Sequence, residues 1–262
     1  MPTHDLRTRL RSEAPLVVAN VITASPVVVE AMAGAPFPAL CFDMEHSTLN
    51  AAAVEGLLRA ADVAGKPVLV RVPEIGADIQ RVLDAGAAGI IVPQVETAAQ
   101  AREVVERARF APEGRRGLGV TRGSVYGAGL ASPGYPAETN ARTLVAIQIE
   151  SVTGVAAADE ILATPGIDAV VIGPGDLSSS LGVPLGAPAF WEAVDTVYAA
   201  AAAHGVAAGS FAFRPDHVRE FASRHTGLLL VGSDLGWIMQ GAAAEWDGIK
   251  RSFAAATVGA SA

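Results

Sequence analysis

The chain has one cysteine, few aromatic residues and no excess of positive charge. Cys41 is the only cysteine among 262 residues, so no internal disulfide can form. Its apolar flanks, with no evident positive neighbour, predict a buried, unreactive thiol. Aromatic residues make up 5% of the chain, so the core must be built from Ala, Val, Leu and Ile. Nineteen Lys and Arg against 27 Asp and Glu give a net charge of −8, which argues against nucleic-acid or anionic-membrane partners.

Long hydrophobic runs are also missing. No apolar run reaches the roughly 18 residues that a membrane-spanning helix needs. The N-terminal Met1–Asp5 lacks the basic start and apolar stretch of a secretory signal, so we expect a cytoplasmic protein with no membrane partner. No composition shift marks a linker. We therefore predict a single domain over residues 1–262, with a core at about 12–253.

Short apolar, β-branched runs alternate with Ala- and Leu-rich stretches of helical periodicity. The expected strands are Leu16–Ala19, Ala39–Phe42, Val68–Val70, Gly89–Val92, Leu144–Ile149, Ala169–Ile172, Val206–Ala208 and Leu228–Val231. The expected helices include Ala51–Ala64, Ile79–Ala85, Ala98–Arg107 and Phe190–His204. This alternation predicts an α/β fold, a (β/α)8 TIM barrel with catalytic residues at the C-terminal ends of its strands. A doubly wound open sheet is the alternative, but its Gly-rich turn is missing after the first strand.

Two segments interrupt the alternation. Phe110–Asn140 is rich in Gly, Pro, Ser and Arg and shows no clear helix or strand, which is typical of a functional or disordered loop. Ala254–Ala262 consists of small residues without a pattern, and we expect a frayed tail there.

Two of the expected strands end in a carboxylate. Val145–Ile149 leads into Glu150, and Ala169–Ile172 is followed by Gly-Pro-Gly and Asp176. Because neighbouring parallel strands can aim such side chains at one point, Glu150 and Asp176 form a candidate site for Mg²⁺ or Mn²⁺.

The ends of two other strands carry polar side chains. Asp43 and His46 are three residues apart on a turn, a spacing that lets a carboxylate orient an imidazole. The alternative is an ordinary helix start capped by Asn50, with His46 in solvent. Arg71 follows a valine run and is either a surface charge or a bidentate ligand for a carboxylate.

Residues beside the two metal candidates add to this site. Gln148 faces the same side as Glu150, because residues two apart on a strand share a face. A buried amide there needs a hydrogen bond, from the protein or from a ligand. Gly173–Asp176 starts an expected helix, whose free N–H groups could bind an anionic group.

Together these segments resemble the HpcH/HpaI family of metal-dependent pyruvate aldolases, from about Leu16 to Gly241. The matching segments are Phe42–His46, Arg109–Gly117, Gln148–Glu150 and Ile172–Ser178. The resemblance implies a class II aldolase on a TIM barrel, which cleaves 4-hydroxy-2-keto acids to pyruvate, or a related 2-keto acid, and an aldehyde. It also implies a divalent cofactor, Mg²⁺, Mn²⁺ or Co²⁺.

The resemblance also implies roles for single residues. Glu150 and Asp176 match the metal carboxylates, and Arg71 matches the arginine that contacts the keto acid and stabilises the enolate. His46, oriented by Asp43, matches the acid/base element.

Further matches concern the substrate. Gln148 matches an amide that contacts substrate or metal-bound water, and the N–H groups of Gly175 and Asp176 match the pocket for the pyruvate carboxylate. Asp84 matches a residue that reaches a neighbouring subunit's site, although on the sequence alone it is as easily a surface charge. Met44 departs from the family, which commonly has Gly there, and we expect an effect on aldehyde specificity.

Other functions remain open. A Schiff-base aldolase is disfavoured, because neither Lys66 nor Lys250 follows a strand. A CoA-ester lyase of the citryl- or malyl-CoA type could use the arginines of Arg109–Arg122, and a citrate-forming enzyme is a further alternative. A barrel that merely binds a keto acid would not explain why four polar residues fall at strand ends.

The expected C-terminal helix, Leu235–Phe253, has more large apolar residues than one buried face needs. They are Leu235, Trp237, Ile238, Met239, Trp246, Ile249 and Phe253. Packing on the barrel or a subunit contact would explain them equally well. The resemblance implies a homohexamer in which this helix exchanges between subunits.

Overall fold

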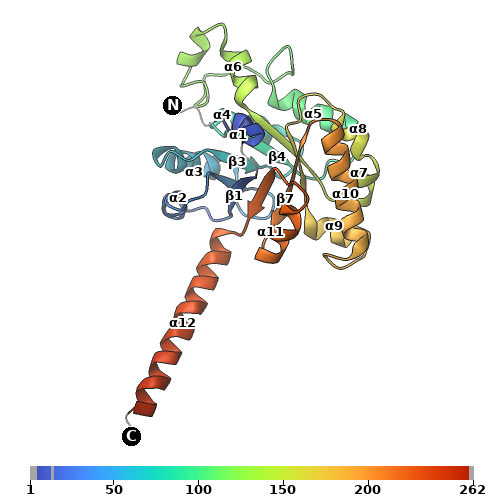
Figure 1. Cartoon of the computed structure of the whole chain (residues 1–262). Helices are drawn as coiled ribbons and strands as arrows, with labels where there is room; N and C mark the ends of the chain where they lie inside the picture. The colour runs from blue at the N-terminus through green and yellow to red at the C-terminus, as the bar shows by residue number, and fades with distance from the viewer. Residues whose placement is uncertain (1–4, 13–14, 260–262) are drawn as a thin grey trace.

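The computed structural model describes residues 5–12 and 15–259 of the chain, and its side chains as far as Ala254. The expectation of no secretory signal rests on Met1–Asp5, and residues 1–4 lie outside the described part of the chain. Eight parallel strands form a closed barrel in the order β1 to β8 (Figure 1). They are β1 Leu16–Val21, β2 Ala39–Asp43, β3 Val68–Arg71, β4 Gly89–Val92, β5 Leu144–Ile149, β6 Ala169–Ile172, β7 Ala207–Ala212 and β8 Leu228–Val231.

The predicted (β/α)8 barrel is confirmed. β1 pairs with β8 as well as with β2, so the sheet closes and the open-sheet alternative is wrong. Only the bounds of β7 differ clearly from the prediction, because that strand continues through Gly209 and Ser210 to Ala212. Gly and Ser have low intrinsic strand propensity, but here both pair with β6 and β8.

Helices lie outside the barrel. Their bounds are α1 Leu6–Ser12, α2 Pro26–Ala33, α3 Ala51–Val63, α4 Ala77–Asp84, α5 Ala98–Ala108, the 3-10 helix Ala128–Ala131, α6 Tyr135–Arg142, α7 Val152–Ala156, α8 Ala158–Leu162, α9 Pro174–Leu181, α10 Pro188–Ala203, α11 Pro215–Ala222 and α12 Asp234–Gly259. Of these, α2, α3, α5 and α7 begin at a Ser, Asn or Thr side-chain cap. Asn50 caps α3, and Thr97 and Gln100 form a capping box on α5. The turn after β2 therefore does run into an Asn-capped helix.

The core has two layers, because strands of a barrel are buried on both faces. One cluster fills the barrel interior and includes Leu16, Val18, Ala39, Cys41, Leu69, Ala146, Val171, Phe211 and Leu230, with Leu6 and Leu10 of α1 beneath them. The other lies between the strands and the helices and includes Ala19 and Val21. Alternation along each strand thus decides which side chains face the interior.

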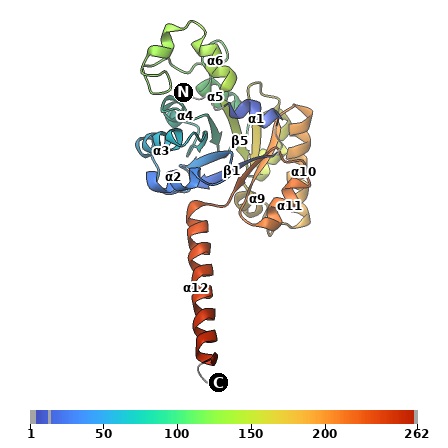
Figure 2. The same ribbon diagram turned by 60° about the vertical axis from the view of Figure 1, so that its left-hand side comes forward.

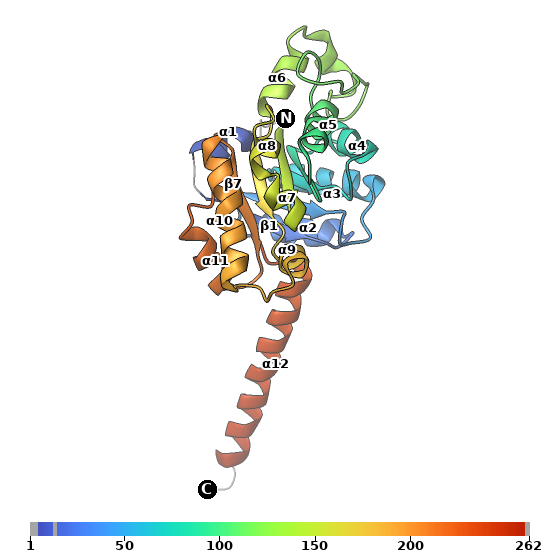
Figure 3. The same cartoon turned by 90° about the vertical axis from the view of Figure 1, so that its right-hand side faces the viewer.

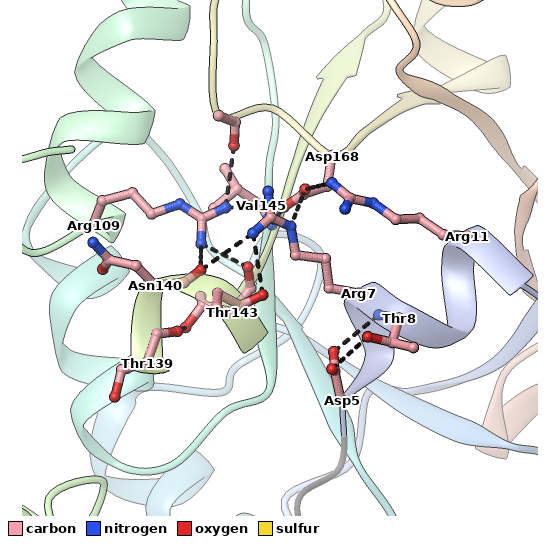
Figure 4. A network of polar contacts seen from close by, with 12 residues as sticks. Asp5, Arg7, Thr8, Arg11, Arg109, Thr139, Asn140, Thr143, Val145 and Asp168 are labelled. Carbon is pink, nitrogen blue, oxygen red and sulfur yellow. Dashed lines mark hydrogen bonds and ion pairs between the residues drawn. The ribbon is translucent and has the colours of Figure 1, made fainter. Parts of the chain in front are cut away.

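A buried ionic network closes the N-terminal end of the barrel (Figure 4). Asp168, just before β6, accepts hydrogen bonds from Arg109 at 3.0 Å and from the backbone N–H of Val145 at 3.0 Å. Arg7 of α1 donates to its other oxygen, and Arg109 also binds the carbonyl of Asn140. Because each buried charge is paired, the network links α1, α5, α6 and the starts of β5 and β6.

The prediction for Phe110–Asn140 is wrong at its end. The segment holds the 3-10 helix and most of α6, and α6 lies beside α1 at the N-terminal end of the barrel (Figure 1). Pro136, at the second helical position, is well placed to start α6 because its fixed φ suits a first turn.

The C-terminal helix α12 leaves the barrel from the opposite end and projects away from it (Figures 1, 2 and 3). It runs to Gly259, so a frayed tail is wrong for residues 254–259, where the Ala-rich sequence favours helix; residues 260–262 lie outside the described part. Trp237 stacks on Phe37, with ring centroids 5.4 Å apart. The other large apolar residues are exposed, namely Leu235, Ile238, Met239, Trp246, Ile249 and Phe253. None of the helices in the described ranges is long and apolar enough to cross a membrane.

Candidate active site

Polar side chains gather at the C-terminal end of the barrel interior. Asp43 ends β2, Arg71 ends β3, and Gln148 and Glu150 lie at the end of β5. All four are buried above a mainly apolar interior. Burial of polar groups is unfavourable unless they are paired, so such a cluster indicates a functional site.

Arg71 is held rigidly by carboxylates. Its Nε and Nη2 donate to the two carboxylate oxygens of Asp43 at 2.9 and 2.5 Å, and its Nη1 lies 2.9 Å from Oε2 of Glu45. The guanidinium lies over the ring of Phe211, 4.6 Å from its centroid. Burial acts to lower the pKa of Arg71, but the hydrogen bond and charge of Asp43 and the charge of Glu45 outweigh it and raise the pKa. Arg71 is therefore a fixed positive charge, and the surface-charge alternative is wrong.

Asp43 does not orient the imidazole of His46, contrary to the sequence-based expectation. Its Oδ1 accepts the backbone N–H groups of Glu45 and His46 at 3.0 and 3.3 Å, while both oxygens bind Arg71. The His46 side chain is 60% exposed, and its Nε2 lies 3.9 Å from Oε2 of Glu45. The bidentate guanidinium from the neighbouring strand is the stronger partner, so Asp43 positions Arg71 and fixes the turn.

Glu150 is buried and surrounded by donors and other carboxylates. Gln148 donates from Nε2 to one of its oxygens, and the backbone N–H of Gln94 donates to the other at 2.9 Å. Burial raises the pKa of Glu150 to about 7; the charges of Glu45 and Asp176 add to the rise, and the two hydrogen bonds oppose it. A positive charge beside Glu150 would therefore stabilise its ionised form.

Gln94 and Glu45 were missed in the sequence. Gln94 has a positive φ of 56°, a backbone conformation uncommon outside glycine, which aims its N–H at Glu150. The dipeptide Pro93-Gln94 after β4 carries no signal for this conformation. Glu45 stands inside the Asp-x-Glu-His element, so its position in a candidate motif was visible although its role was not.

Asp176 lies in the first turn of α9, which begins directly after β6. It is exposed, and together with Glu150, Gln94 and Ser151 it lines a pocket of about 430 Å³. Gly173 precedes the helix where a Cβ atom would fall 2.1 Å from Oε2 of Glu150, so glycine is required there. The structure thus brings Glu150, Gln148, Asp176 and the N–H groups at the start of α9 to one end of the barrel.

The donor set fits a divalent cation. Glu150 and Asp176 supply carboxylate oxygens, and the buried Oε1 of Gln148 has no hydrogen-bond partner. Within the described ranges, no group of three or more His, Cys, Asp or Glu side chains is arranged to coordinate a metal ion. Two carboxylates with open positions for substrate and water are the arrangement that Mg²⁺-like ions favour.

Asp84 lies away from this site. It ends α4, near the N-terminal end of the barrel, and accepts a hydrogen bond from Arg116 at 2.6 Å. Lys66 also precedes its strand, with Nζ 2.8 Å from the carbonyl oxygen of Phe37, so it does not lie at the catalytic end. Cys41 is buried as predicted; burial, chiefly, raises the pKa of its thiol to about 12 even though Arg71 lies close enough to oppose the rise.

Comparison with known proteins connects this geometry to a family. Residues 18–240 match the model of the HpcH/HpaI aldolase/citrate lyase family. The chain belongs to this family. It is 36% identical over 217 residues to the 5-keto-4-deoxy-D-glucarate aldolase of Klebsiella pneumoniae, covering 81% of this chain and 84% of that protein. It is 34% identical over 249 residues to the hydroxypyruvate/pyruvate aldolase of Delftia acidovorans, covering 93% and 91%.

A solved structure agrees. The HpcH/HpaI aldolase/citrate lyase family protein of Burkholderia cenocepacia superposes with a TM-score of 0.88 at 33% identity, over 95% of this chain and 100% of that one. This HpcH/HpaI protein is thus an aldolase, a carbon–carbon lyase, as the sequence predicts.

Proposed function

We propose that this family member is a divalent-metal-dependent aldolase. It reversibly cleaves 4-hydroxy-2-keto acids to pyruvate, or a related 2-keto acid, and an aldehyde. The observation that carries the proposal is the position of Arg71, locked by Asp43 and Glu45, at the same end of the barrel as Glu150 and Asp176.

Glu150 and Asp176 would hold the cation, Mg²⁺, Mn²⁺ or Co²⁺, with Gln148 beside them. When bound, the cation supplies a Lewis acid for the 2-keto oxygen. A cation next to Glu150 would also keep this carboxylate ionised, against the burial that raises its pKa to about 7.

The chain's own residues then act on the keto acid. Arg71 stabilises negative charge on the keto oxygen as the enolate forms, and it is already oriented before substrate binds. The N–H groups of Gly175 and Asp176 bind the substrate carboxylate. His46, exposed at the rim beside Glu45, exchanges the proton of the 4-hydroxyl group.

The assembly we propose is a homohexamer in the cytoplasm. α12 carries six exposed large apolar residues on a helix that projects from the barrel, and burying them against another copy is favourable. Asp84 would reach a neighbouring copy's site in this assembly.

The geometry favours an aldolase over a CoA-ester lyase. Arg109, Arg116 and Arg122 each bind a carboxylate of the protein, Asp168, Asp84 and Asp62 respectively. Because the charge of each of these three arginines is paired within the protein, they do not form a basic path for the CoA phosphates to the site. A citrate-forming condensation uses the same enolate chemistry and is the second candidate.

A panel of 4-hydroxy-2-keto acids tests the proposal, with pyruvate release measured before and after EDTA treatment. We expect release that EDTA abolishes and added Mg²⁺ or Mn²⁺ restores. Release from CoA thioesters, or citrate formation from oxaloacetate without any aldol cleavage, would replace the proposed function by an alternative.

A further inference from the structure

Asn20 is a polar residue inside the barrel that the proposed reaction does not use. It lies on β1 two residues after Val18, which faces the barrel interior, whereas its neighbours Ala19 and Val21 face the helices. Its side chain therefore points inward, and only 4% of the residue is exposed. Within the described part of the chain, its Oδ1 has no hydrogen-bond partner.

The position of Asn20 places it under the catalytic end. Asn20 is the register partner of Cys41 on β2, two residues before Asp43, and Asp43 in turn pairs with Arg71 on β3. The end of β1 is fixed by Asp234, which accepts the backbone N–H groups of Ile22 and Thr23 at 3.0 and 3.1 Å. The backbone around Asn20 is thus held by β2 and Asp234, and its side chain lies next to the layer of side chains that would hold the keto acid.

A buried acceptor without a partner destabilises the folded chain, and an aliphatic residue at this position would not. The unpaired oxygen is explained if a ligand supplies the missing donor. Pyruvate cannot, because its ionised carboxylate and keto oxygen are acceptors and its C3 is a methyl group. In the proposed pose the carboxylate binds at the start of α9 and the keto oxygen faces Arg71, so C3 is the part left for other contacts.

We propose that Oδ1 of Asn20 accepts a hydrogen bond from a hydroxyl group on C3 of the 2-keto acid. The preferred nucleophile is then a 3-hydroxy-2-keto acid such as 3-hydroxypyruvate rather than pyruvate. This inference rests on the proposed function and specifies the keto acid that it uses.

The test compares wild type with Asn20→Leu, which keeps the shape and removes the acceptor. With one aldehyde and saturating metal, we expect the ratio of kcat/KM for 3-hydroxypyruvate to that for pyruvate to fall roughly 10- to 100-fold, since a lost partner leaves the hydroxyl unpaired. The value for pyruvate should stay within about threefold. Cys41→Ala, a change at the adjacent inward position, is the matched control and should leave the ratio unchanged.

A second measurement does not depend on aldol turnover. Thermal unfolding of Asn20→Leu should occur at the wild-type temperature or above, because an unpaired buried amide is removed. Saturating 3-hydroxypyruvate should stabilise wild type more than pyruvate does, and this difference should vanish in Asn20→Leu.

The outcomes separate the two proposals. If wild type with metal neither exchanges C3 protons of the keto acids with deuterium nor cleaves any 4-hydroxy-2-keto acid, the proposed function fails. If both keto acids exchange their C3 protons, and the ratio of kcat/KM for 3-hydroxypyruvate to that for pyruvate is the same in wild type and Asn20→Leu, the role of Asn20 is overturned. A fall of more than about 5 °C in both Asn20→Leu and Asn20→Ala would make the amide structural and also overturn it.

Discussion

The carboxylate of Asp43 binds the guanidinium of Arg71 through two parallel hydrogen bonds, with Nε–Oδ1 and Nη2–Oδ2 distances of 2.9 and 2.5 Å. The two residues are register partners on β2 and β3. The barrel itself therefore sets their separation, and Arg71 needs little reorganisation when charge develops on a substrate.

Replacing Arg71 should reduce the rate of the chemical step. For Arg71→Ala we expect kcat to fall by about 10²-fold or more, the scale for loss of a preorganised charge donor. Arg71→Lys should recover only part of the loss, because an ammonium cannot satisfy both oxygens of Asp43. Steady-state kinetics check this, and an effect confined to KM for the aldehyde would contradict it.

The carboxylates of Glu150 and Asp176 should be required for metal binding. For Glu150→Ala or Asp176→Ala we expect Mn²⁺ affinity, measured by calorimetry, to fall by at least about tenfold. Circular dichroism should remain that of a folded barrel, since neither residue belongs to the apolar core. Glu96→Ala, in the same pocket, is a control that should retain most of the affinity. Full activity of Glu150→Ala without metal would rule out the assignment.

His46 should serve the aldehyde half of the reaction. His46→Ala should slow retro-aldol cleavage by about 10²-fold, the lower range for general acid–base catalysis, and affect pyruvate C3 exchange much less. Its exposure also predicts an unchanged melting temperature. Deuterium exchange followed by NMR separates the half-reactions. An equal loss of rate in both half-reactions would instead indicate that His46 removes the proton from the pyruvate methyl group.

Cys41 should be inert to alkylation in the folded protein. Its thiol pKa rises from 9.0 to about 12, chiefly through burial, so near pH 8 only about one molecule in 10⁴ holds a thiolate. Because the unfolded chain ionises at the lower value, this thiol leaves the stability independent of pH below about 9, and it lowers the stability as the pH rises from about 9 towards 12. Iodoacetamide labelling followed by mass spectrometry checks this, with a urea-unfolded sample as control. Rapid labelling of the folded protein would be the contrary result.

Shortening α12 should disrupt assembly. A chain that ends at Gly241 loses Trp246, Ile249 and Phe253, and we expect light scattering to show a smaller species than the full chain. Lys250→Ala changes a charged position of the same helix and should leave the mass unchanged. An active monomer of the full chain at assay concentration would argue against both the exchange of α12 and a shared site.

The sequence was sufficient for features that depend on neighbours along the chain. The barrel followed from alternating apolar runs, and the placement of Glu150 and Asp176 at its rim followed because a charge after a buried run must lie there. Ala-rich residues 254–259 and the first residues of α6, which follow Gly134 and include Pro136, were missed, because composition alone does not separate weak helices from loops.

Features set by partners on other strands were not predictable. Asp43 was matched to His46, three residues on, whereas its partner Arg71 lies 28 residues away. The same limit applies to Gln94, whose unusual φ matters only because Glu150 is opposite, and to Asn20, whose inward direction depends on barrel closure.

The buried Asp168 has a mechanical consequence for the distant rim. It precedes β6 and also holds the first residues of β5, so the two strands that end near Glu150 and Asp176 start from one shared anchor. A six-residue strand spans about 20 Å and is stiff along its length. Any sliding of β5 against β6 at this anchor would appear at the far end as a change in the gap between two carboxylates. The distance between Glu150 and Asp176 at the C-terminal end thus depends on the Asp168 anchor at the N-terminal end of the barrel.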